Sequence, residues 1–168
     1  GIETFDMISE GGLPANRTTL VSGTAGCGKT VFAIQFLAEG IQRENESGVF
    51  VTFEESAPDI RKNMRGFGWD LAGWEEAGKL AFVDASPDPE HDLVESGSFD
   101  LSALLVRVRS AIERVGAKRV SFDSLGAVFA QFDDEAIVRR ELFRIASALK
   151  KMGVTAILTA ERTDDYGS

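Results

Sequence analysis

The chain has 168 residues, the size of a single domain, and 43 % of them are hydrophobic, which excludes a disordered protein. Its formal net charge of -9 argues against a nucleic-acid binder, because such proteins need a basic surface against the phosphate backbone. The single cysteine, Cys27, excludes an internal disulfide, and no apolar run reaches the roughly 20 residues of a membrane span. We therefore expect a soluble, cytoplasmic protein.

The chain begins with a predicted strand, helix and strand. Residues 19–23 (TLVSG) are typical of a strand that enters a glycine-rich turn. In residues 30–42 apolar side chains recur at helical spacing, which predicts a helix. Residues 49–53 (VFVTF) are a second predicted strand, and the acidic pair Glu54 and Glu55 follows it directly.

A helix, a strand and a long loop are predicted next. Ser56 can cap a helix that we expect to end around residues 67–69. Residues 80–84 (LAFVD) are a third predicted strand. The segment from Ser86 to Ser98 is rich in proline and charge and is predicted to be a loop, which is long enough to suggest a function.

The remaining part alternates in the same way. Residues 100–115 have the pattern of an amphipathic helix, and residues 119–123 (RVSFD) that of a fourth strand. The longest predicted helix covers residues 134–152 and ends at Gly153, a suitable C-cap residue. Residues 154–159 (VTAILT) are a fifth predicted strand.

Alternating strands and helices with short connections predict an α/β fold with a mostly parallel sheet and helices on both faces. In such sheets ligands bind at the carboxyl ends of the strands. The residues expected along that edge are Gly23, Glu54, Asp84, Asp123 and Thr159.

A phosphate-binding loop is predicted where the first strand meets the first helix. The pattern G-x-x-x-x-G-K-[ST] is matched at every fixed position. Its glycines let the backbone wrap a phosphate chain, and the N–H groups at the start of a helix favour anions. Lys29 is expected to reach the β- and γ-phosphates, and the Thr30 hydroxyl to bind Mg²⁺. The residues of this loop are Gly23, Thr24, Ala25, Gly26, Cys27, Gly28, Lys29 and Thr30.

Other interpretations of this loop are weaker. The spacing does not fit the dinucleotide fingerprint G-x-G-x-x-G, in which the pair Lys29-Thr30 would have no role. A helix start could lower the pKa of the Cys27 thiol, but a small residue that fills the loop explains Cys27 more simply. The sequence also lacks the N-K-x-D pattern of guanine-specific proteins.

Three acids are candidates for the chemistry. Asp123 ends a hydrophobic strand, and beside a phosphate-binding loop we interpret it as the residue that holds Mg²⁺ through a water, in preference to a turn or helix cap. Glu54 or Glu55 could polarise the attacking water. Both could equally be acids that stabilise the start of the next helix, and the residues alone do not choose.

Segments along nearly the whole chain, in the same order, resemble the KaiC family of clock ATPases. They are GIETFDMISEGG, LPANRTTLVSG, GTAGCGKT, VFVTFEES, GFGWDL, VDASPDPE, FDLSAL, VSFDS, VRRELFR and TAERTDDYG. KaiC proteins have two tandem RecA-type domains, and VRRELFR and SPDPE are similar to the first. The Ser/Thr pair that the second, kinase domain phosphorylates has no counterpart here.

The resemblance implies a RecA-like sheet and a homo-hexameric ring with ATP between subunits. It implies that Glu54 activates water with support from Glu55, and that the nucleotide contacts Gly26 through Val31. It further implies that the loop from Ser86 to Ser98 docks a KaiB-like partner.

The chain departs from the family at three places. Gly66 stands where the family has an adenine-contacting serine, and Cys27 where it commonly has threonine. The family domain continues with further strands and with basic residues that reach a neighbour's phosphates. We therefore expect residues 1–168 to form a KaiC-type domain that lacks the last strands.

The leading hypothesis is a Mg²⁺-dependent ATPase domain of a KaiC-like timer protein with slow hydrolysis that controls partner binding. A DNA-dependent ATPase of the RecA or DnaB type is one alternative, which the acidic composition disfavours. The other alternative is a nucleotide-switched binding module in which turnover is incidental.

Overall fold

The computed structural model describes residues 15–23, 28–86, 101–130 and 132–161. Its centre is a five-stranded sheet in which all neighbouring strands are parallel, as predicted. The order across the sheet is β1-β5-β4-β2-β3. The strands are β1 (Thr18–Gly23), β2 (Gly48–Thr52), β3 (Leu80–Asp84), β4 (Arg119–Asp123) and β5 (Thr155–Glu161).

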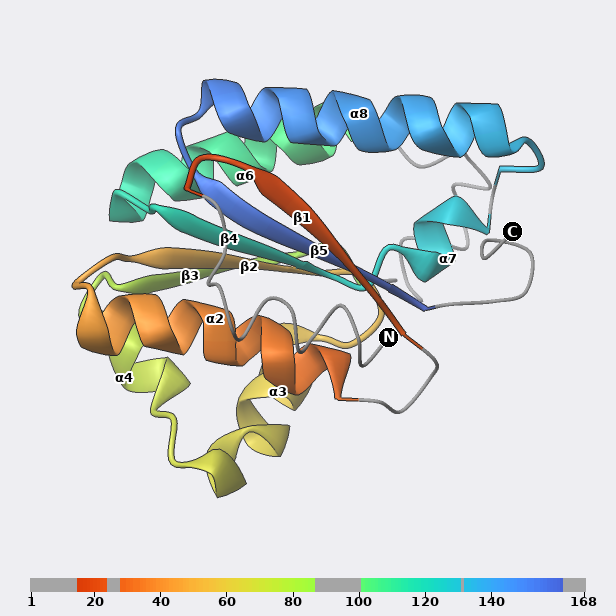
Figure 1. Cartoon of the computed structure of the whole chain (residues 1–168). Coiled ribbons are helices and arrows are strands. Elements are labelled where there is room, and N and C mark those ends of the chain that lie inside the picture. Colours follow the sequence, from red (N-terminus) through yellow and green to blue (C-terminus); the bar gives the residue numbers. More distant parts are fainter. Residues whose placement is uncertain (1–14, 24–27, 87–100, 131, 162–168) are drawn as a thin grey trace.

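Helices cover both faces of the sheet, which makes three layers (Figure 1). The helices α2, α3 and α4 lie on one face, and α6 and α8 on the other, while the short α7 lies near the carboxyl ends of the strands. Their bounds are α2 (Lys29–Arg43), α3 (Ala57–Asn63), η1 (Arg65–Phe67, a 3₁₀ turn), α4 (Leu71–Glu76), α6 (Leu101–Val115), α7 (Gly126–Phe129) and α8 (Glu135–Lys151).

Each face of the sheet packs its own hydrophobic core. The apolar side of α2 meets the sheet through Ile34 and Phe50, both almost fully buried. On the opposite face Val108 of α6 and Leu149 of α8 pack over Phe122. The strand β2 is buried along its whole length, as expected for the interior of a parallel sheet that is covered on both sides.

The strand register brings the predicted edge residues together. Thr52 at the end of β2 is paired with both Asp84 of β3 and Asp123 of β4. Across the other half of the sheet, Gly23 is level with Glu161. Polar groups that are far apart in sequence therefore share one edge of the sheet.

Helix boundaries differ from the predictions mainly after β2. Ser56 caps α3 as predicted, since its Oγ accepts from the Asp59 N–H at 3.3 Å. The helix ends earlier than expected, at Asn63 with Met64 as its C-cap, and η1 follows it. The sequence pattern predicts no helix at α4, which Asp70 caps, or at α7.

The last strand begins at Thr155 and continues to Glu161, two residues beyond the predicted end. In the described parts of the chain, none of the helices has the length and apolarity that crossing a bilayer requires.

Candidate functional site

The first turn of α2 places the lysine and threonine of the predicted loop. Gly28 precedes the helix with a φ of 81°, a left-handed conformation that a residue with a Cβ rarely adopts. The Lys29 ammonium donates to the Gly23 carbonyl oxygen at 3.3 Å and so links the helix to the end of β1. The loop residues between these points lie outside the described residues: Thr24, Ala25, Gly26 and Cys27.

Asp123 joins three elements at the end of β4. The Thr30 hydroxyl of α2 donates to its Oδ2 at 2.7 Å, and the Thr159 hydroxyl of β5 lies 2.6 Å from its Oδ1. The aspartate is 7 % exposed. The two residues predicted to hold Mg²⁺, Thr30 and Asp123, are therefore in direct contact.

Glu54 and Glu55 lie in a turn beyond the end of β2, and both are exposed. The strand ends at Thr52, so the alternation of side chains along a strand does not decide which acid faces the phosphates. Thr52 fixes this turn by donating its hydroxyl to the Glu55 carbonyl oxygen at 2.6 Å. The Glu55 carboxylate also accepts from the Asn63 side chain of α3 at 3.3 Å.

These groups surround a single pocket of about 270 Å³. Its lining combines the start of α2, the turn after β2 and the end of β4. The lining residues are Gly28, Lys29, Thr30, Val31, Glu54, Glu55, Asp123 and Ser124. All the described residues of the predicted site, Gly23 and Gly66 excepted, thus line one pocket.

Gly66 is exposed in η1 and is not among the residues that line this pocket, whereas Gly23 reaches it through the contact of its carbonyl with Lys29. Ser124, which directly follows Asp123 and lines the pocket, was not predicted from the sequence. Thr159 was predicted at the correct edge of the sheet but without a role.

Asp84 organises the neighbouring edge of the site. Its carboxylate accepts from the Ala57 N–H at 2.9 Å and from the Ser86 N–H at 2.9 Å, and also from the Ser86 hydroxyl. Burial alone raises the pKa of Asp84, but these hydrogen bonds and the charge of Arg107 lower it overall. A charged Asp84 therefore holds the start of α3, which follows the Glu54-Glu55 turn.

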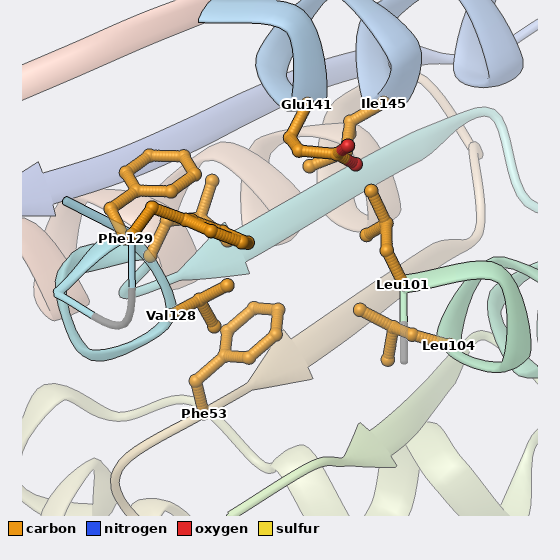
Figure 2. Close-up of a pocket in the computed structure, with 9 residues that line it drawn as sticks. Phe53, Leu101, Leu104, Val128, Phe129, Glu141 and Ile145 are labelled. Atoms are coloured by element: carbon orange, nitrogen blue, oxygen red, sulfur yellow. The ribbon is translucent and has the colours of Figure 1, made fainter. Parts of the chain in front are cut away.

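Figure 2 shows a second, small cavity on the side of α6, α7 and α8. Phe53, next to Glu54, packs there with its ring centroid 6.0 Å from that of Phe122. Apart from Glu141 of α8, the lining is apolar, so the cavity belongs to the packing beneath the site. The lining residues are Phe53, Leu101, Leu104, Leu125, Val128, Phe129, Phe132, Glu141 and Ile145.

The parallel sheet, with a helix that starts directly after Gly28 beside a strand that ends in Asp123, defines an α/β protein with the RecA-like P-loop fold. A family model described as "ATPase: KaiC" matches residues 1–168. The chain therefore belongs to the KaiC ATPase family.

Curated relatives agree with this assignment. The circadian clock protein KaiC3 of Synechocystis sp. is 58 % identical over 167 residues, which cover 99 % of this chain and 33 % of that protein. The circadian clock oscillator protein KaiC of Thermosynechococcus vestitus is 58 % identical over 166 residues, covering 99 % and 32 %. That of Synechococcus elongatus is 57 % identical, also over 166 residues. The chain thus spans about a third of the length of the relatives it matches.

Proposed function

We propose that this chain binds ATP with Mg²⁺ and hydrolyses it, as an ATPase domain of a KaiC-like protein. The observation that carries the proposal is the single pocket in which Lys29 and Thr30 face Asp123 and the Glu54-Glu55 turn. A cation, a hydroxyl and carboxylates around one cavity are the groups that phosphate transfer to water requires.

The triphosphate would lie along the start of α2. The helix N–H groups that have no partner within the helix favour an anion there, and Lys29 would exchange its weak contact with the Gly23 carbonyl for the β- and γ-phosphates. The loop residues from Gly23 to Thr30 and Val31 would surround the phosphates. Gly66 would lie near the adenine and, having no side chain, could contact it only with its backbone.

The oxygen atoms of Thr30 and Asp123 fit Mg²⁺, which prefers oxygen ligands and few protein contacts. Among the described residues no group of three or more His, Cys, Asp or Glu side chains could hold a metal ion by itself. Phosphate oxygens and waters would therefore complete the coordination. Bound Mg²⁺ supplies charge that neutralises the phosphate oxygens.

Hydrolysis requires a base near the attacking water. We assign this role to Glu54, whose carboxylate would accept the proton while the water oxygen bonds to the γ-phosphorus and the bond to the β-phosphate oxygen breaks. Glu55 would support Glu54 by fixing the turn, because its carboxylate accepts a hydrogen bond from Asn63 and its carbonyl oxygen accepts one from Thr52.

The test is ATP hydrolysis by the full-length protein. Glu54→Gln should keep ATP bound and slow phosphate release by about 10²-fold or more, because the amide retains the shape but cannot accept a proton. Unchanged hydrolysis in this variant would contradict the assignment of the base.

We further propose that the protein forms a hexameric ring with nucleotide between subunits, and that slow hydrolysis controls binding of a KaiB-like partner at the loop from Ser86 to Ser98. Relatives named as circadian clock oscillator proteins support a role of this kind. Residues 87–98 of that loop lie outside the described residues.

A further inference from the structure

Thr159 lies at the carboxyl edge of β5 and is fully buried. A hydroxyl side chain in the interior of a sheet needs a hydrogen-bond partner, since burying it without one is unfavourable. Its Oγ1 lies 2.6 Å from Asp123 Oδ1 and 3.3 Å from the Phe122 carbonyl oxygen. The hydroxyl has one proton, and the shorter of the two distances identifies Asp123 as the main partner.

The Asp123 carboxylate is consequently held from two sides. Thr159 donates to Oδ1 from β5, while Thr30 donates to Oδ2 from α2. The backbone is fixed as well, because the Phe53 N–H donates to the Asp123 carbonyl at 3.1 Å and the Leu125 N–H to the Thr159 carbonyl at 2.9 Å. Rotation of the carboxylate would break its hydrogen bond with Thr159, with Thr30, or with both.

We propose that Thr159 is a positioning residue: its hydrogen bond fixes the orientation in which the Asp123 carboxylate would hold Mg²⁺. This inference rests on the proposed function of the same pocket. Thr159 is not among the residues that line the pocket, so it acts through Asp123 and does not touch nucleotide or metal. With Oδ1 occupied by Thr159, the carboxylate presents Oδ2 on the side of Thr30.

The experiment compares the affinity of ADP with Mg²⁺ and with EDTA, by calorimetry on the full-length protein. The part of the ADP binding that Lys29→Ala abolishes is assigned to this pocket. Thr159→Val keeps the shape of the side chain and removes the donor. Loss of the partner that orients a metal-holding group typically weakens metal binding by about 10- to 100-fold, so the gain in affinity from Mg²⁺ should fall by about that factor. Affinity in EDTA should stay close to that of the wild type, because Thr159 does not line the pocket.

Two further variants separate positioning from general packing. Thr159→Ser keeps the hydroxyl and should restore the Mg²⁺-dependent gain. Ser121→Ala removes another fully buried hydroxyl of the same sheet, which donates to the Ala33 carbonyl at 2.8 Å, and should leave the gain unchanged.

A Thr159→Val protein that keeps the full Mg²⁺-dependent gain would overturn the inference, as would one that loses affinity equally with Mg²⁺ and with EDTA. A Thr159→Val protein that fails to fold while Thr159→Ser folds without the gain would overturn it too. If Lys29→Ala leaves ADP binding unchanged, the pocket does not bind nucleotide and the proposed function is wrong. If Lys29→Ala removes ADP binding but Thr159→Val has no effect, only the inference about Thr159 is wrong.

Discussion

At the residue scale, Glu54 and Glu55 lie next to each other in one turn of the pocket but have different proposed roles. The Glu55 carboxylate accepts from Asn63, and its backbone carbonyl accepts from Thr52. Glu55→Gln is therefore the matched control for Glu54→Gln, because both replace a carboxylate with an amide in the same turn. Glu55→Gln should slow hydrolysis much less than the roughly 10²-fold expected for Glu54→Gln. A silent Glu54→Gln beside a damaging Glu55→Gln would reverse the two roles.

Individual site residues could be predicted where a short pattern encodes their chemistry. The spacing of Gly28, Lys29 and Thr30 is enough to predict a phosphate-binding turn, and the structure places all three in one pocket. Thr159 could not be assigned in this way. Its role depends on β5 lying beside β4, and strand order is a property of the whole sheet.

At the scale of elements, the hydrogen bonds of Asp84 connect β3 to the start of α3. The folded-state pKa of Asp84 lies below its ordinary value of 3.8, so its charged form stabilises the fold. This contribution is complete above the unfolded-state pKa and is lost as the pH falls through the folded-state pKa.

Asp84→Asn should therefore lower the thermal unfolding midpoint at neutral pH, through the loss of about 1 kcal/mol or less for a half-buried group. The difference from the wild type should shrink below about pH 4. Ser86→Ala should move this pH dependence to higher pH, because it removes a donor to the carboxylate. A difference that stays constant from pH 7 to pH 3 would contradict the role of the charge.

The loop from Ser86 to Ser98 provides a second prediction about an element. Replacing residues 88–96 with a Gly/Ser linker should weaken binding of a KaiB-like partner, because Pro89 and the charged side chains of this segment are lost. ATP hydrolysis should remain nearly intact, since no residue of this segment is expected to contact phosphate. Pull-down and phosphate-release assays on the same samples would measure both. Lost hydrolysis with partner binding preserved would place the loop in the active site instead.

Most strands and helices were predictable because the spacing of their apolar residues indicates which side chains are buried. Residues 80–84 and 119–123 were predicted with the bounds that the structure gives to β3 and β4. Short helices were not predictable in this way. The helix α4 depends on its cap at Asp70. The helix α7 has only four residues, too few to be stable without packing beside the sheet.

At the scale of the whole molecule, assembly should depend on nucleotide. A nucleotide that contacts two subunits stabilises their interface, so occupancy and assembly are linked. The full-length protein should sediment as a hexamer with ATP and as smaller species without it. A protein that remains monomeric at all ATP concentrations would contradict the proposed ring.

The most direct test of the central claim, that this pocket binds ATP, is the nucleotide affinity of Lys29→Ala measured by calorimetry on the full-length protein with Mg²⁺. Loss of the ammonium removes charge-assisted hydrogen bonds to the phosphates, so ATP binding at this site should be abolished. Glu54→Gln, measured in parallel, should bind ATP as the wild type does. ATP affinity and stoichiometry that are unchanged in Lys29→Ala would show that this pocket does not bind ATP.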